Sequence, residues 1–215
     1  IYLKDFGGDE NFHLFSVDLK GENLKDLTPF DSVTVQVVDE LEEHPDEMLI
    51  GMNKRVKEIF DVYRLNVKTG TMTLAAENPG NITGWVTDHD GNIRAASTTD
   101  GVNTTLLYRE TEKDAFKPIV TTNFKEAVSP LFFTFDNKYV YAASNVGRDK
   151  SAIVKYDIAN GKELGTLFEP PDVDVSDLTF SKQRKALTSI NSTTWQRERK
   201  ILVTHIEQIF NKIQS

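Results

Sequence analysis

The sequence predicts an all-β chain built from tandem four-stranded antiparallel units. Apolar residues alternate with a period of two almost everywhere, which is the pattern of β-strands. A strand–turn–strand phrase recurs along the chain, and a second kind of strand pair lies between its copies. The clearest copies of the phrase are DVYRLNVKTGTMTLAA (residues 61–76) and IVKYDIANGKELGTLF (residues 153–168).

The recurring phrase has the form of a tight hairpin. In its first copy, residues 62–67 alternate between the two faces of a strand, and Gly70 supplies the positive φ that the turn requires. A polar residue precedes the turn in each copy, at spacings of 48, 44 and 47 residues: Asp18, Asn66, Glu110 and Asp157. A repeat of this length is typical of a β-propeller blade, whereas a β-sandwich predicts no fixed repeat.

The inner strand pairs of these blades are expected at WVTDHDGNIRAAS, from Trp85, and FFTFDNKYVYAAS, from Phe132, with looser copies from Val35 and Leu178. The strands then number three, four, four, four and about three, which is fewer than five complete blades need. We therefore expect a β-propeller portion, an open arc of about four to five four-stranded blades. The expected blade ranges are 1–30, 33–77, 82–122, 128–169 and 175–215.

The two ends of such an arc predict further properties. The blade faces beside Ile1 and Ser215 should be apolar, which favours self-association through open blade edges. The C-terminus departs from the strand pattern and predicts a short amphipathic helix, because apolar residues occur at helical spacing: Ile206, Ile209, Phe210 and Ile213.

The charge and composition of the chain limit the kinds of partner it is expected to bind. The net charge of -8 disfavours nucleic acid and anionic membrane surfaces, and no apolar run is long enough to span a membrane. There is no cysteine, so thiolate chemistry and disulfides are excluded and the redox compartment stays open, cytoplasmic or periplasmic/secreted. The chain starts at Ile1 without a signal-like segment, which leads us to expect a processed or excised piece.

Four phrases in this order resemble the propeller domain of prolyl oligopeptidase family serine peptidases, the acylaminoacyl peptidase and dipeptidyl aminopeptidase relatives: GGDENFHLFSVD, EIFDVYRLNVKTG, WVTDHDGNIRAA and SNVGRDKSAIVKYD. The resemblance covers residues 1 to about 180. It implies a propeller that caps an α/β-hydrolase domain and screens which peptides reach the catalytic serine. The implied role of these residues is to gate peptide access, with a peptide substrate as the partner of the parent enzyme.

Catalytic residues are not expected in this chain. An α/β-hydrolase needs a serine on a Gly-x-Ser-x-Gly elbow, and the sequence has none. The four histidines, His13, His44, His89 and His205, lie in strand, helix or turn patterns away from any glycine-flanked serine. The hydrolase domain is therefore expected outside these residues, and no cofactor is expected within them.

Two acidic clusters raise the question of a metal. Residues 88–92, DHDGN, resemble part of a calcium loop but lack the distant bidentate glutamate, and a strand-joining turn explains the same residues. The acidic run 39–47 could attract a cationic peptide end, but we interpret it as a solvated loop. No metal site is predicted.

Arg148 and Asp149 are the candidate substrate-binding residues, because arginine captures a carboxylate through two hydrogen bonds. We favour structural pairing of Arg148 with Asp149 or with a carboxylate of a neighbouring blade over this substrate contact. The aromatic residues of the inner strand pairs are expected to fill the core between blades: Trp85, Phe132, Phe133, Phe135 and Tyr141.

Two other functions remain open. The first is a stand-alone propeller resembling the TolB type, which would bind a protein or peptide through its acidic turns. The second is a metal-dependent propeller hydrolase, which is disfavoured because no matching Glu/Asn/Asp set recurs at corresponding repeat positions. A Gly-x-Ser-x-Gly motif downstream in the parent reading frame would select the peptidase, and a stop soon after Ser215 would select the stand-alone module.

Overall fold

A computed structural model describes residues 1–203 and residue 208 of the chain. The chain divides into two compact units, Ile1–Ile93 and Arg94–Ser215. In the part described, eighteen strands form five antiparallel sheets of three, four, four, four and three strands. These strand numbers are the ones expected from the hairpin repeat.

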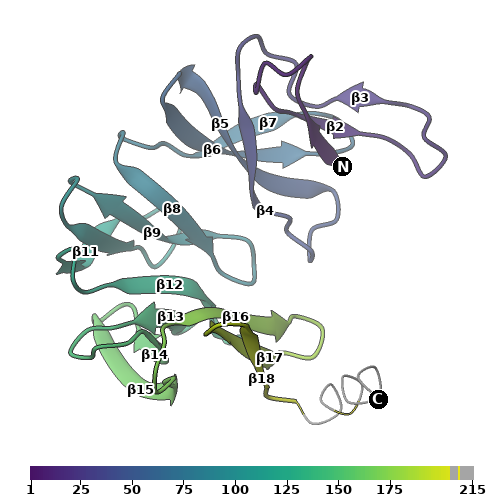
Figure 1. Ribbon diagram of the computed structural model, residues 1–215. Helices are drawn as coiled ribbons and strands as arrows, with labels where there is room; N and C mark the ends of the chain where they lie inside the picture. Colours follow the sequence, from purple (N-terminus) through teal and green to yellow (C-terminus); the bar gives the residue numbers. More distant parts are fainter. Residues whose placement is uncertain (204–207, 209–215) are drawn as a thin grey trace. The chain divides into compact units, whose positions relative to one another are not determined.

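The first unit contains the first two sheets and strand β8 (Figure 1). The first sheet has the order β1-β2-β3 and the second the order β4-β5-β6-β7. The strands are β1 (Tyr2–Lys4), β2 (His13–Ser16), β3 (Lys25–Asp26), β4 (Val35–Asp39), β5 (Glu47–Val56), β6 (Ile59–Asn66), β7 (Met72–Ala76) and β8 (Ile82–Thr87).

The second unit begins within β9, which pairs in the sheet β11-β10-β9-β8. Two further sheets follow, β12-β13-β14-β15 and β16-β17-β18. The strands are β9 (Ile93–Thr99), β10 (Thr104–Tyr108), β11 (Lys117–Thr122), β12 (Val128–Phe133), β13 (Val140–Ser144), β14 (Ala152–Asp157), β15 (Lys162–Phe168), β16 (Val175–Ser181), β17 (Ala186–Thr193) and β18 (Arg197–Ile201).

The polar residue before each turn explains why the phrase recurs. Asn66 accepts hydrogen bonds at Oδ1 from the backbone N–H groups of Lys68 and Thr69, and Gly70 has φ of 80°. Asp157 accepts in the same way from the N–H of Asn160. Short Asn and Asp side chains form such turns readily because they bond their own backbone a few residues on. The predicted hairpins are confirmed.

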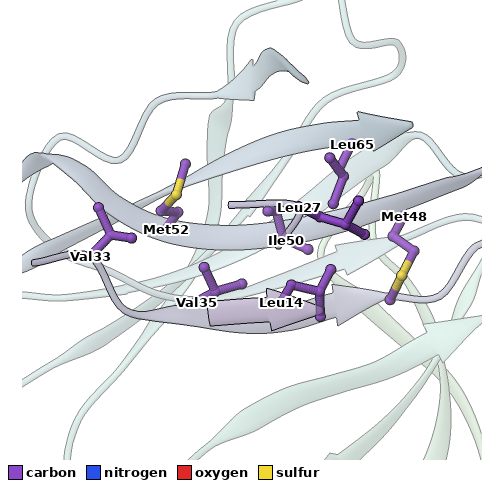
Figure 2. Packing of buried hydrophobic residues seen from close by; sticks show 8 residues of the cluster. All are labelled: Leu14, Leu27, Val33, Val35, Met48, Ile50, Met52 and Leu65. Carbon is purple, nitrogen blue, oxygen red and sulfur yellow. The ribbon is translucent and has the colours of Figure 1, made fainter. Parts of the chain in front are cut away.

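Each unit has its own apolar core. In the first unit, buried side chains of the first two sheets and their connection form one cluster, shown in Figure 2: Leu14, Leu27, Val33, Val35, Met48, Ile50, Met52 and Leu65. In the second unit, Phe132 packs on Phe180 with ring centroids 4.1 Å apart and on Tyr141 at 5.4 Å. Core packing is thus confirmed for Phe132 and Tyr141, and Phe133 is completely buried.

The prediction of an all-β chain with four-stranded antiparallel sheets is confirmed. The predicted C-terminal helix depends on Ile206, Ile209, Phe210 and Ile213, which lie outside the described residues. Within residues 1–203 and 208, no helix has the length and apolar character needed to cross a membrane.

Candidate functional site

Two strands of the first unit, β4 and β8, flank the candidate site. Each is the terminal strand of its own sheet. Their C-terminal ends are tied together by a hydrogen bond that Thr87 Oγ1 donates to the Asp39 carboxylate. This hydrogen bond connects the two terminal strands at their C-terminal ends.

A cavity of about 340 Å³ opens toward the N-terminal parts of these strands. Its lining residues come from β4, from the β5–β6 turn and the start of β6, from the loop after β7 and from β8: Gln36, Val37, Val38, Glu58, Ile59, Phe60, Asn78, Gly80, Ile82, Thr83, Gly84 and Trp85. Trp85, expected in the core, is half-buried and lines this cavity instead. Phe132, which also lies on a terminal strand, is covered by Phe180 of β16, whereas Trp85 faces the cavity.

The cavity lining combines apolar side chains with a few polar groups. Apolar walls from Phe60, Ile82 and Trp85 alternate with amide and hydroxyl groups, and Glu58 is the single charged residue among the lining residues. They include no serine, histidine, lysine or cysteine. Apolar walls with a few polar groups are typical of small-molecule and peptide sites.

The loop that closes the cavity is held by Asn78. Its side-chain oxygen accepts hydrogen bonds from the N–H groups of Gly80 at 2.8 Å and Ile82 at 3.0 Å, and its Nδ2 donates to the Ile82 carbonyl. Asn78 is itself anchored, because its N–H donates to Asp61 Oδ1 at 2.8 Å and its carbonyl accepts from Arg55 Nη2 at 2.8 Å. Through this network, strands β5 and β6 hold the loop in position.

Asp61 is the centre of that network. Its side chain has no exposed surface and accepts from Arg55 Nε at 2.8 Å and Nη2 at 2.9 Å. Burial alone would raise the pKa of Asp61, but the hydrogen bonds from Arg55 and from the Asn78 N–H outweigh it and lower the pKa. The carboxylate is therefore charged over the whole neutral range.

Arg148 and Asp149, the predicted substrate-binding residues, belong to the second unit, before β14, and are not among the lining residues of this cavity. Arg148 Nη1 donates to Glu163 Oε2 at 3.0 Å, and Nη2 donates to Glu163 Oε1 and to Thr166 Oγ1. The hydrogen bond to Glu163 raises the pKa of Arg148, and the same bond lowers the pKa of Glu163. The bidentate geometry expected for a substrate carboxylate is thus taken up by Glu163 of β15.

Asp149 does not pair with Arg148 through any interaction that the structure records. Its side chain is 90% exposed, and it lies 3.1 Å from Lys150 Nζ. Nothing places a ligand on this segment. A substrate contact for Arg148 and Asp149 stays a prediction.

The acidic turns have structural roles. Asp88 accepts hydrogen bonds from the N–H groups of Asp90 and Asn92, and Gly91 has φ of 79°, so the turn interpretation of residues 88–92 is confirmed. The run 39–47 is only partly a solvated loop, because Leu41 is buried against the Gly91 turn. Among the residues described, no group of three or more His, Cys, Asp and Glu could hold a metal ion.

His13 and His44 each have a hydrogen-bonding partner. A ring nitrogen of the buried His13 lies 2.8 Å from Asp26 Oδ2, and His44 Nε2 lies 3.3 Å from the Asp90 carbonyl. His205 lies outside the described residues. The strand and turn placement expected for His13 and His44 is confirmed.

Meanders of four antiparallel strands that follow one another along a chain define the β-propeller class of proteins, and this chain is of that class. Over 164 residues the chain is 35% identical to dipeptidyl aminopeptidase BIII from Pseudoxanthomonas mexicana, a match that covers 75% of this chain and 24% of that protein. This segment is therefore homologous to part of a dipeptidyl aminopeptidase, which confirms the resemblance drawn from the sequence. No family model matches the chain.

Two solved structures share the fold. TolB from Acinetobacter baumannii matches with a TM-score of 0.61 and 16% identity over 89% of this chain and 46% of that chain. A puromycin hydrolase S511A mutant complexed with PGG matches with a TM-score of 0.58 and 14% identity over 88% of this chain and 32% of that chain. The chain thus spans about a quarter of the curated relative and less than half of either solved structure.

The sequence analysis missed the cavity. Its lining residues are ordinary strand and turn residues from segments that are far apart in the sequence, and they come together only in the folded unit. One signal was present: the turn sequence ENPGN at residues 77–81 precedes β8 and contains the loop-forming Asn78.

Proposed function

We propose that this chain is the non-catalytic propeller region of a prolyl oligopeptidase family serine peptidase and that it gates peptide access to an α/β-hydrolase domain outside these residues. The observation that carries the proposal is the 35% identity to a dipeptidyl aminopeptidase over 164 residues. The absence of a Gly-x-Ser-x-Gly elbow from the sequence supports a role other than bond cleavage.

In this proposal the five sheets are consecutive blades, with ranges of about 1–30, 33–77, 82–122, 128–169 and 175–215. They form an open arc of four to five blades, whose end faces pack on other blades or on a second copy. The support is the repeated order of the sheets, in which the strands of each sheet follow directly from those of the previous one.

The cavity beside β4 and β8 is the part of the chain that we assign to peptide contact. Terminal strands of neighbouring sheets can bind an extended peptide through the backbone, while Phe60 and Trp85 offer apolar surface for its side chains. Glu58 is placed to attract the positively charged amino end of a peptide. Arg148 and Asp149 are a second proposed contact, for which the exposed Asp149 carboxylate is the accessible group.

The test uses the full-length polypeptide that contains these residues. Glu58→Lys reverses the single charge of the cavity lining, and Glu43→Lys makes the same change on an exposed residue that does not line it. We expect Glu58→Lys to lower kcat/KM for peptides at least tenfold while kcat/KM for a small p-nitrophenyl ester stays within twofold. Glu43→Lys should change neither. Equal loss on peptide and ester, or no loss on either, would contradict the gating role of this cavity.

The stand-alone binding module remains the second candidate. Its support is the likeness to TolB, which concerns the fold alone. A full-length protein that carries no reactive serine would favour it over the peptidase.

A further inference from the structure

Three glycines of the chain lie inside strands: Gly51 in β5, Gly84 in β8 and Gly165 in β15. The other nine of its twelve glycines have positive φ, the conformation for which glycine is the ordinary choice. A glycine inside a strand weakens the strand, because it has no side chain to pack and loses the most freedom on folding. Such a glycine often marks a bulge or a place where another group approaches the backbone closely.

Two of these three glycines have a reason within the protein. Gly51 pairs with Gln36 of β4, and a Cβ on Gly51 would lie 2.9 Å from Cγ and Nε2 of Gln36. The glycine therefore makes room for the glutamine side chain. Gly165 lies beside a β-bulge, where the register of β14 and β15 skips Leu164.

Gly84, in contrast, lines the cavity beside β4 and β8. It is an inner residue of β8, its φ is not positive, and a Cβ on it would meet no atom within 4 Å. Neither backbone conformation nor a neighbouring side chain therefore requires glycine at this position. A side chain placed there would enter space that the protein leaves open.

The cavity follows the edge of β8, which is the terminal strand of its sheet. Successive side chains of a strand point to opposite faces, so Ile82 and Gly84 belong to one face and Thr83 and Trp85 to the other. All four residues line the cavity. The missing side chain of Gly84 thus opens the part of the cavity that adjoins Ile82.

The size and charge of the cavity suit the amino end of a peptide. Its volume of about 340 Å³ is at the lower end of the range for ligand pockets, roughly 300–1,000 Å³, which favours one or two residues over a long segment. Glu58 is the single charged lining residue and complements an ammonium group. Several lining side chains are apolar, among them Val37, Ile59, Phe60 and Ile82.

We propose that Gly84 determines the specificity of this cavity, by leaving room for a large apolar side chain in the first two residues of a peptide with a free amino end. The ammonium group of the peptide lies near Glu58, and the apolar side chain lies on the backbone of Gly84 beside Ile82. The inference rests on the peptide contact proposed above, and it adds the class of side chain that this contact selects.

The probes are two synthetic peptides, FFK and GGK, which carry fluorescein on the lysine side chain and differ only in the two residues at the free amino end. The full-length polypeptide is first treated with a fluorophosphonate, so that a reactive serine cannot cleave them. Fluorescence anisotropy measures binding. We expect FFK to bind at least tenfold more tightly than GGK, because only its side chains fill the space over Gly84.

Gly84→Leu fills that space, and Gly165→Leu is the matched control. Gly165 is also a strand glycine whose Cβ would meet nothing within 4 Å, and it does not line the cavity. Gly84→Leu should weaken binding of FFK at least tenfold, and Gly165→Leu less than twofold. Gly84→Ala, a smaller change, should give an intermediate loss and provides the test if the leucine variant does not fold.

Equal binding of FFK to the wild type and the Gly84 variants would overturn the inference, as would equal binding of FFK and GGK or an equal loss in Gly165→Leu. The outcome that separates this inference from the proposed function is FFK binding that Glu58→Lys abolishes and Gly84→Leu leaves intact. The cavity would then bind the peptide without selecting its side chain through Gly84. No binding of FFK, together with unchanged kcat/KM in Glu58→Lys, would contradict both proposals.

Discussion

Asp61 and Arg55 form a two-point ion pair in which the Asp61 side chain has no exposed surface while the Arg55 side chain is 38% exposed. The asymmetry follows from their positions, since Asp61 lies inside β6 and Arg55 near the end of β5. Because Asp61 also accepts from the Asn78 N–H, the pair connects strand packing to the loop that closes the cavity.

Asp61→Ala should lower the free energy of unfolding by about 2 kcal/mol at pH 7, because it leaves the Asn78 N–H without this acceptor. Arg55 can turn its exposed side to water, so the larger cost of a fully buried broken pair is not expected. Urea unfolding measures the difference. A change below 0.5 kcal/mol, in the range of ordinary surface substitutions, would show that the network contributes nothing.

The same pair predicts a pH dependence. The pKa of Asp61 lies below its ordinary value of 3.8, so its contribution to stability is fully present above that value and is lost as pH falls through the folded-state pKa. The stability difference between the wild type and Asp61→Ala should stay constant from pH 7 to 5 and shrink below about pH 4. A difference that grows toward low pH would contradict this assignment.

Arg148→Lys tests whether Arg148 is held by Glu163. Lysine cannot reproduce the two-point contact, so we expect a loss of about 1 kcal/mol in the free energy of unfolding. Asp149→Asn, on the exposed neighbour, should change stability by less than about 0.5 kcal/mol. Equal stability of Arg148→Lys and the wild type would leave Arg148 available as the substrate contact predicted from the sequence.

Alanine substitutions at Gly91 and Gly101 distinguish the cost of backbone strain from the cost of side-chain packing. Both have positive φ, but a Cβ on Gly91 would lie 2.8 Å from Leu41 Cδ2, whereas a Cβ on Gly101 meets nothing within 4 Å. Gly101→Ala should cost about 1 kcal/mol from backbone conformation alone, and Gly91→Ala about 1 kcal/mol more, because Leu41 is buried. Equal costs in urea unfolding would show that Leu41 moves aside freely.

The hydroxyl of Tyr108 should ionise at a higher pH than that of an ordinary tyrosine. Burial, together with its hydrogen bond to Glu110, raises the pKa of Tyr108 to about 12. A raised tyrosine pKa adds stability that is complete below the unfolded value near 10 and is lost as pH rises toward about 12. At pH 11, absorbance near 295 nm should therefore count the same number of tyrosinates, within about a tenth, in the wild type and in Tyr108→Phe. One additional tyrosinate in the wild type would disprove the shift.

The hairpins and the strand numbers of the sheets could be predicted because their causes are local. Asn66 and Asp157 bond their own turns, and Gly70 and Gly161 supply positive φ, so the signal is present in a few consecutive letters. The inner aromatic residues were placed correctly where a neighbouring sheet covers them, as with Phe132.

The candidate site could not be predicted in the same way. Trp85 and Phe132 have the same pattern and both lie on terminal strands, but Phe180 of another sheet covers Phe132, whereas Trp85 lines a cavity. The partner of Arg148 could not be predicted from the sequence either. Glu163 lies beside Arg148 because β14 pairs with β15, and not because the two residues are close in the sequence. Which carboxylate lies opposite an arginine is decided by strand register.

The most direct test of the central claim compares the isolated 215-residue chain with the full-length polypeptide that contains it. Dipeptidyl p-nitroanilides and a fluorophosphonate probe measure turnover and the presence of an activated serine. We predict turnover and serine labelling for the full-length protein and neither for the isolated chain. Turnover by the isolated chain that survives repurification, or a full-length protein with no labelled serine, would contradict the account.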